Sequence, residues 1–215
     1  MSILSKLSSQ VGDRSESSNR QVVLECLNAP DLLGEIAEGL RSKDAALVGD
    51  CAEVLTQVAE QHPDWVAPYA EALAALVSHK KTRVRWEVMH ALALVTASAP
   101  AVIEPLLPKL AEMIRADSSV IVRDYATDAL ANYAALDHAA AEKAYPLLKE
   151  ALTVWGSKQA GHALKGLANV AMQVPALRDE LHSIAEKYAS SDNRAVVRKA
   201  AKALLKAILL SESAG

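Results

Sequence analysis

The sequence is poor in the residue types that build disulfide frameworks, zinc sites and aromatic cores. It has no phenylalanine, only two cysteines and eight glycines, and aromatic residues make up 4% of its 215 residues. A disulfide framework or a zinc site needs more ligands at short spacing than Cys26 and Cys51 provide. We therefore expect two buried, reduced thiols and a soluble chain in a reducing, cytoplasmic compartment.

Long apolar runs are also missing. The longest uncharged apolar stretch, "ALALVTASAPAVI", is too short to span a bilayer and contains Pro100. The opening residues "MSILSKLSSQ" lack the charged and then apolar pattern of a signal peptide. The sequence predicts no membrane-spanning segment and no membrane partner.

Motifs of known enzyme chemistry do not occur. There is no glycine-rich phosphate loop, no H-E-x-x-H and no G-x-S-x-G. The six histidines lie in separate segments, and no two of them share a helix at metal-ligand spacing. Nothing indicates a nucleophile beside a base that a third group orients. We expect no catalytic residues, no metal and no cofactor, and hence a protein that is not an enzyme.

What the chain has in quantity is alanine, about a fifth of all residues, within a composition that is 51% hydrophobic. Alanine and leucine at this density favour helix throughout. The formal net charge of −3 gives no general reason to expect a nucleic-acid partner. The charge is uneven, however, since residues 1–104 sum to −5 and residues 155–215 to +4.

The chain repeats itself every 37 or 38 residues. "VRWEVMHALALV" begins at residue 84, "VRDYATDALANY" at 122 and "VRKAAKALLKAI" at 197, and degenerate copies begin at 47 and 159. Within each copy the apolar positions recur at offsets 0, +4 and +7/+8, which is one buried face of a helix. A second apolar helix precedes each copy, and Pro63, Pro100 and Pro175 punctuate the turns between repeats. Such a helix pair cannot bury both faces alone and must stack on its neighbours.

These repeats resemble HEAT repeats, the armadillo-like α-solenoid family. The resemblance covers about residues 31–210 and implies an all-α fold, a right-handed α-α superhelix of about five helix pairs with an N-terminal capping helix. In that family a Val-Arg pair opens the second helix, and an aspartate lies in the loop before it. The resemblance therefore implies a structural ladder between neighbouring repeats, formed by Arg85, Arg123, Arg198, Asp117 and Asp192. Val48 and Ala160 depart from the arginine position, and His79 replaces an aspartate.

The repeat register predicts the domain organisation. Residues 1–19 are expected to be a flexible segment with a possible short helix, and 20–28 a helix that covers the first repeat. A single repeat domain follows over 20–210, with helix pairs at about 31–66, 67–103, 104–141, 142–178 and 179–210, and residues 211–215 form a tail.

Offsets +2 and +6 of the second helices should face the concave side of such a stack. The side chains there that could bind a partner are Trp86, His90, Asp124, Asp128 and Lys165, and Glu53 takes the same position in the first repeat. Aromatic residues often anchor interfaces. Trp86 has an alternative role in packing between repeats, with His90 then an ordinary surface residue. Trp65 and Trp155 are interpreted as packing at repeat edges, and Lys199, Lys202 and Lys206 as the solvated face of a capping helix.

Two classes of function remain open. The first is a non-enzymatic scaffold that binds a protein or peptide on the concave face, and a monomer is favoured over an oligomer. The second is nucleic-acid binding, with or without base excision, through the basic C-terminal end with Lys199, Lys202 and Lys206, and the repeats also resemble the HEAT-like alkylpurine DNA glycosylases. That family relies on a concave Trp and Asp one turn apart and on a basic groove. Here His90 stands where the carboxylate would follow Trp86, and the acidic first half opposes binding along a duplex.

Overall fold

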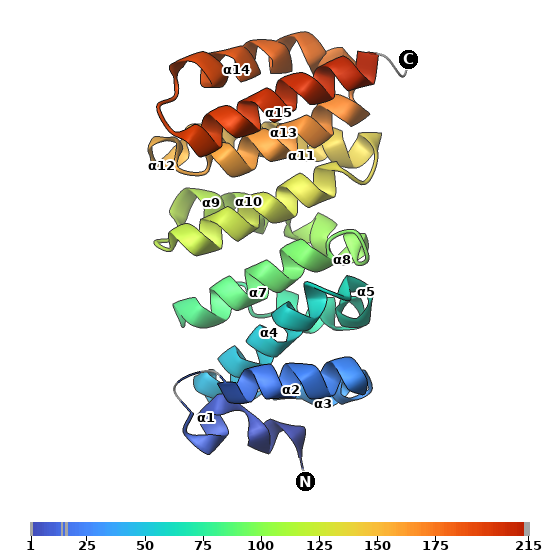
Figure 1. Ribbon diagram of the computed structural model, residues 1–215, viewed down its shortest axis with the longest axis vertical. Helices are drawn as coiled ribbons and strands as arrows, with labels where there is room; N and C mark the ends of the chain where they lie inside the picture. Colours follow the sequence, from blue (N-terminus) through green and yellow to red (C-terminus); the bar gives the residue numbers. More distant parts are fainter. Residues whose placement is uncertain (1, 14, 16, 213–215) are drawn as a thin grey trace. The chain divides into compact units, whose positions relative to one another are not determined.

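The computed structural model describes residues 2–13, 15 and 17–212, and every regular element in these ranges is a helix. Contacts divide the chain into two compact units, Met1–Val102 (unit 1) and Ile103–Gly215 (unit 2). Figure 1 follows the helices from the N-terminus to the C-terminus. No helix in the described ranges is long and apolar enough to cross a bilayer.

Unit 1 begins with short elements and continues with two helix pairs. Its elements are η1 (Ile3–Lys6), α1 (Ser8–Val11), α2 (Ser17–Asn28), α3 (Leu32–Gly39), α4 (Ala45–Ala59), α5 (Pro63–Val66), η2 (Ala67–Tyr69), α6 (Ala70–Ala74) and α7 (Thr82–Val95). The helix α4 packs against α2, α3 and α7, and α7 also contacts α5 and α6. The helix α8 (Pro100–Ile103) spans the residue at which the two units divide.

Unit 2 contains three further pairs. Its elements are η3 (Glu104–Leu106), α9 (Leu107–Ala116), α10 (Val120–Ala134), α11 (His138–Ala151), α12 (Val154–Ser157), α13 (Ala160–Gln173), η4 (Pro175–Leu177), α14 (Arg178–Ser191) and α15 (Ala195–Glu212). The helix α13 packs against α10, α11 and α15, so the second helices of successive pairs form one layer within the unit.

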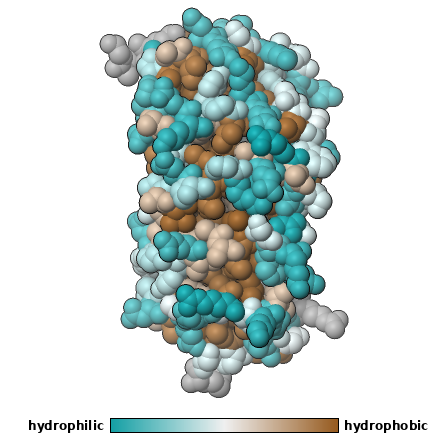
Figure 2. Space-filling model, turned by 180° about the vertical axis from the view of Figure 1, so that it is seen from behind, coloured by the Kyte–Doolittle hydropathy of each residue, from teal (hydrophilic) through white to brown (hydrophobic). Residues whose placement is uncertain are grey.

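The apolar stripe predicted for the second helices is buried. Val84, Val88, Ala91 and Leu92 of α7 are at most 1% exposed, and the equivalent residues of α10 are fully buried. Small side chains in the stripe let neighbouring helices approach closely, while leucines fill the remaining volume. Figure 2 shows the side turned away in Figure 1, where hydrophilic residues cover much of the surface and hydrophobic ones are visible between them.

The first helix pair begins close to the predicted residue 31, and each of the later pairs begins about four residues earlier than the sequence indicated. Pro63, Pro100 and Pro175 are the first residues of α5, α8 and η4, and so start first helices rather than marking the turns before them. A proline is well suited to that position because the first helical N–H has no intrahelical partner to lose. Pro68 and Pro105 then lie in the 3-10 turns η2 and η3, which interrupt the first helix in both pairs.

The N-terminal segment differs from the flexible one that its polar composition predicted. Ile3 and Leu7 are buried, and the backbone N–H of Ser8 donates to Asn19 Oδ1 at 2.8 Å. The segment up to Ser8 is therefore anchored by these buried residues, whereas Val11 is 54% exposed, and Arg14 and Glu16 of the predicted flexible stretch lie outside the described residues. Of the predicted tail, residues 211 and 212 continue α15 and 213–215 lie outside the described residues.

Candidate functional site

The predicted anchors Trp86 and His90 lie one turn apart on α7 in unit 1. Both side chains are only partly exposed, and the Trp86 indole Nε1 donates to Glu87 Oε1 at 2.7 Å. The backbone carbonyl of Glu87 accepts from Thr56 Oγ1 on α4 at 3.0 Å. Trp86 is thus held at a packed part of α7, with some of its surface open to a partner.

Glu53, which the sequence placed on an exposed concave position, is only 6% exposed. The reason is that α2 packs over α4, and Asn19 Nδ2 donates to Glu53 at 2.9 Å. Asp50, one turn earlier, is 1% exposed and accepts from the Ser9 backbone N–H at 2.7 Å. Arg83 Nη2 lies 2.9 Å from Asp50 and 2.7 Å from Glu53, so one guanidinium pairs with two buried carboxylates.

Burial alone would raise the pKa of Asp50, but its hydrogen bonds with Ser9 and Asn19 and the charge of Arg83 outweigh it. The pKa of Asp50 therefore lies below its ordinary value, and that of Arg83 above its own. The cluster fastens the N-terminal segment to α4 and α7. Sequence patterns gave no sign of it, because its polar members come from four separate segments.

In unit 2, Asp124 and Asp128 lie one turn apart on α10 and both approach His162 on α13. His162 Nδ1 is 2.7 Å from Asp128 Oδ1, and its Nε2 is 3.9 Å from Asp124 Oδ1. Gln159 Nε2 donates to Asp124 at 3.1 Å. Lys165, one turn beyond His162, is exposed. We call Asp124, Asp128, His162 and Lys165 the unit 2 ridge.

The hydrogen bond with Asp128 is the main reason that the pKa of His162 is raised. Burial lowers it in part, Asp124 adds to the increase, and the nearby ammonium of Lys165 opposes it. The sequence analysis identified both aspartates but not this histidine. The sequence does place His162 outside the buried stripe of its helix. Its partner aspartates are 34 and 38 residues earlier, however, so the helix pattern alone could not predict the contact.

We expect the stability conferred by His162 to depend on pH. A raised folded-state pKa makes the stabilisation complete below the unfolded value of about 6.5, and the stabilisation disappears as pH rises through the folded-state pKa. The unfolding free energy of the wild type relative to His162→Gln should therefore be larger near pH 6 than near pH 9. Urea titrations of both proteins across this range test the sign. A difference that grows with pH would contradict the assigned contacts.

The three arginines that the resemblance assigned to a ladder between repeats each donate to a backbone carbonyl in the loop of their own repeat. Arg85 donates to the carbonyl of His79 at 2.9 Å, Arg123 to that of Asp117 at 2.5 Å and Arg198 to that of Asp192 at 3.1 Å. The Asp192 carboxylate pairs with Arg194 at 2.6 Å. These contacts fix the loop that joins the two helices of a pair.

Trp155 stands in the corresponding loop of the fourth repeat, where Ala160 takes the arginine position. Its backbone is left-handed, with φ 52° and ψ 37°, and Gly156 and Ser157 also have positive φ. This conformation costs about 1–2 kcal/mol per non-glycine residue. Two contacts offset the cost: the indole Nε1 donates to the carbonyl of Ile114 at 3.1 Å, and the Arg123 guanidinium lies 4.1 Å from the ring centroid. Trp155 therefore packs between repeats, as predicted, yet it remains 44% exposed.

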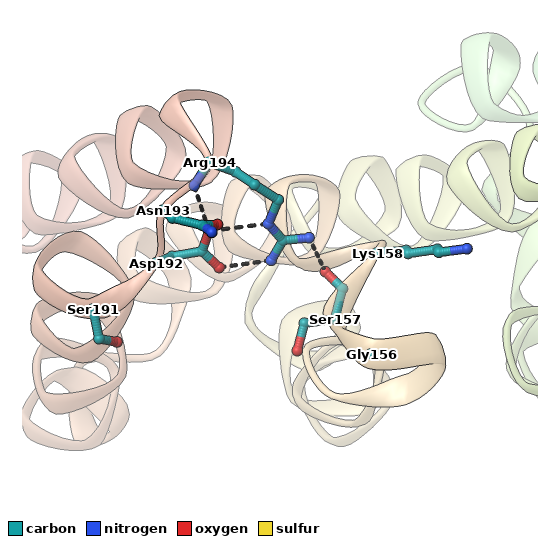
Figure 3. Close-up of a pocket in the computed structure, with 7 residues that line it drawn as sticks. All are labelled: Gly156, Ser157, Lys158, Ser191, Asp192, Asn193 and Arg194. Carbon is teal, nitrogen blue, oxygen red and sulfur yellow. Dashed lines mark hydrogen bonds and ion pairs between the residues drawn. The ribbon is translucent and has the colours of Figure 1, made fainter.

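An open cavity of about 630 Å³ adjoins this loop in unit 2. It is lined by Gly156, Ser157, Lys158, Ser191, Asp192, Asn193 and Arg194. Figure 3 shows Arg194 between the Asp192 carboxylate and the carbonyl of Ser157, with Lys158 pointing away from this ion pair. No group of three or more histidine, cysteine or acidic side chains in the described part of the chain could hold a metal ion.

No protein-family model and no curated protein matches the chain. Solved structures do match it over nearly the whole length. An engineered protein aligns with a TM-score of 0.72 at 20% identity, covering 97% of this chain and 96% of its own. A designed armadillo repeat protein in complex with the peptide (KR)4 aligns with a TM-score of 0.73 at 18% identity, covering 96% of this chain and 98% of its own. A computationally designed armadillo repeat protein for modular peptide recognition gives 0.71 at 19% identity, covering 95% and 98%.

These likenesses establish the fold. The chain is an all-α helical-repeat solenoid, similar to designed armadillo repeat proteins, as the repeat pattern of its sequence predicted. A fold of this class hosts many functions, so the function must be argued from the residues that it presents.

Proposed function

We propose that the chain is a non-enzymatic scaffold whose second helices hold a protein or peptide segment. The observation that carries this proposal is the unit 2 ridge, where two carboxylates, an imidazole and an ammonium lie partly exposed above a fully buried apolar stripe. Partly exposed charged groups arranged along one helix layer are suited to fixing the register of an extended partner.

The ridge specifies the chemistry of the segment. Asp124 and Asp128 can accept hydrogen bonds from a cationic side chain, and Lys165 can pair with an anionic one further along. Two of the structural neighbours are described as a peptide complex and as designs for peptide recognition, which supports a peptide as the kind of partner. In unit 1, Trp86 and His90 on α7 are proposed as further anchors, through the part of each side chain that is exposed.

We do not propose nucleic-acid binding for the ridge, because its two carboxylates would face a phosphate backbone and repel it. A cytoplasmic, reducing compartment is proposed together with the scaffold function. It is supported by the two free cysteines, whose burial raises the pKa of Cys26 to about 11 and that of Cys51 to about 12. Thiols in that state are poor nucleophiles and do not suggest redox chemistry.

The test is capture of partners from an extract of the native host, followed by affinity measurement with the isolated partner. Replacing Asp124 and Asp128 together by alanine should weaken binding about tenfold or more, since charged anchors at an interface centre carry much of its energy. Trp86→Ala should weaken binding less, because the indole is partly buried. Glu112→Ala and Glu142→Ala, which remove the same charge from exposed positions of the first helices α9 and α11, serve as controls. If both the double variant and Trp86→Ala bound the partner as tightly as the wild type, neither the ridge nor α7 would be its binding surface.

A further inference from the structure

The loop of the fourth repeat exposes an aromatic surface that the proposed ridge does not use. Trp155 is 44% exposed although one face of its ring is covered by Arg123, which is itself only 1% exposed. The indole is held at three points: by Arg123, by the carbonyl of Ile114 and by its left-handed backbone. Its remaining surface is therefore presented in a fixed orientation, which reduces the conformational entropy that the Trp155 side chain loses when a partner binds.

Aliphatic side chains are exposed along the same edge of unit 2. Ile121 on the first turn of α10 is 44% exposed, and Val196 on the first turn of α15 is 64% exposed. The N-terminal ends of α10, α13 and α15 lie along the edge that carries α12 (Figure 1). Val196 also lies 4.0 Å from the position of a Cβ on Gly161, at the start of α13, so the aliphatic residues extend across neighbouring helices. Exposed apolar groups along one edge can contribute to interaction sites.

The charge around the indole has one dominant sign. Lys158, Arg194, Arg198 and Lys199 are cationic and Asp192 is the single carboxylate in residues 155–158 and 191–199, a net charge of +3. Asp192 is already neutralised by Arg194, and the hydrogen bonds and charge of that arginine hold the pKa of Asp192 at about 2. The cavity of about 630 Å³ lies between these groups and is lined by hydroxyl, amide and cationic side chains and by the Asp192 carboxylate that Arg194 pairs with. Its walls can receive a carboxylate by hydrogen bonds from Ser157, Ser191 and Asn193, and Lys158, which points away from the Asp192–Arg194 pair, adds a positive charge at the edge of the cavity (Figure 3).

We propose that residues 155–158 and 191–194, the Trp155 edge, form a docking site for an acidic peptide segment that carries a large apolar side chain. The apolar side chain packs on the exposed surface of Trp155, and neighbouring carboxylates enter the cavity beside Lys158. The exposed aliphatic groups at the first turns of α10 and α15 favour a peptide over a single-stranded nucleic acid, since bases stack on flat aromatic faces. This site adjoins the unit 2 ridge, because Gln159, next to Lys158, donates to Asp124, but it differs from the ridge in charge.

The site is tested with a panel of ten-residue peptides in which phenylalanine, tryptophan or leucine is flanked by glutamates. The readouts are the indole N–H signal of Trp155 in protein with ¹⁵N-labelled tryptophan, and fluorescence anisotropy of the labelled peptides. The wild type should bind at least one member with a shift of the Trp155 signal. Lys158→Glu, which alters an exposed side chain, should weaken binding about tenfold. Trp155→Gly should do the same, and glycine is chosen because it adopts a positive φ readily.

Three controls separate the alternatives. Lys187→Glu reverses an exposed charge elsewhere in unit 2 and should leave the affinity within about twofold. The Asp124 and Asp128 double alanine variant should bind these peptides as the wild type does, so failure of the ridge and failure of this site give different results. Peptides with lysine in place of glutamate, and an oligothymidine of ten nucleotides, should not shift the Trp155 signal.

The proposal is overturned if no acidic member of the panel shifts the Trp155 signal at millimolar concentration. It is equally overturned if Lys158→Glu and Trp155→Gly bind as tightly as the wild type. A larger shift with oligothymidine than with any peptide would assign the edge to single-stranded nucleic acid instead.

Discussion

Arg83→Met is expected to lower the free energy of unfolding by about 3 kcal/mol at neutral pH, because it leaves two buried carboxylates without a counter-charge. The side chains of Asp50 and Glu53 are 1% and 8% exposed, whereas that of Arg83 is 33% exposed, so the carboxylates carry most of the penalty. Methionine keeps the apolar stem of the arginine and removes only the charge and its hydrogen bonds. Urea unfolding followed by circular dichroism measures the loss.

The same variant should respond to pH in a defined direction. In the wild type the pKa of Asp50 is lowered, so its contribution to stability is present above the unfolded value of about 3.9 and is lost as pH falls through the folded-state pKa. Without Arg83 the hydrogen bonds with Ser9 and Asn19 remain but one cause of the lowered pKa is lost, so the pKa of Asp50 is higher than in the wild type and acid relieves the variant by protonating the carboxyl group. The difference between wild type and variant should therefore shrink as pH falls from about 7 towards 4.

Arg41→Met is the matched control, since Arg41 pairs with Glu38 at 3.0 Å and both side chains are more than half exposed. Exposed pairs contribute about 0–1 kcal/mol, so this variant should stay near the wild type. Neutralising the carboxylates in an Arg83→Met, Asp50→Asn, Glu53→Gln triple variant should recover part of the loss, because amides can be buried without a counter-charge. If Arg83→Met were no less stable than Arg41→Met, the buried cluster would not be a source of stability.

The repeat architecture could be predicted from sequence because it depends on a local and periodic property. Apolar residues at offsets 0, +4 and +7/+8 must be buried whatever the partner, and the stripe of Val84, Val88 and Leu92 is buried in the structure. The starts of the later helix pairs were placed about four residues late, because Pro63 and Pro100 were interpreted as turn residues. A proline fits both roles, and only the structure distinguishes them.

The candidate sites were less predictable because they depend on contacts between distant segments. The helix period predicted an open face for Glu53. It could not predict that α2 covers this face and that Asn19 binds Glu53. It placed Asp124 and Asp128 together, and their shared partner His162 comes from the next helix pair. Trp155 is exposed because the backbone of residues 155–157 is left-handed. In "VWGSK" only the glycine favours that conformation, so the sequence did not predict the turn. Side chains on the periodic face are therefore predictable, and those set by loops or by the N-terminal segment are not.

Gly166 shows how far close packing controls this fold, and Gly166→Ala is expected to destabilise the chain by about 1–2 kcal/mol. In the middle of an exposed helix the same change would stabilise by about 1 kcal/mol. Here a Cβ on Gly166 would lie 2.6 Å from Leu148 Cδ2 and 3.0 Å from the Cβ of Ala131. Leu148 is fully buried, so its methyl groups have no free space to move into, and overpacking of this kind costs about 1–3 kcal/mol.

Gly161 on the same helix provides the matched control, because the nearest atom to its added Cβ is Val196 Cγ2 at 4.0 Å. Gly161→Ala should therefore leave stability unchanged or raise it by up to about 1 kcal/mol. Leu148→Ala alone should cost about 2–5 kcal/mol through the cavity it opens. Combined with Gly166→Ala it should cost less than the sum of the two, because the new methyl group enters the space that the leucine vacated.

The wild type, the two single variants and the double variant form a double-mutant cycle, and urea unfolding measures the stability of all four and of the Gly161→Ala control. Additive losses, or a Gly166→Ala variant as stable as Gly161→Ala, would mean that the contact between α11 and α13 is looser than the structure describes. A favourable coupling would show that the close contact of these two helices, and not backbone flexibility, requires glycine at this position.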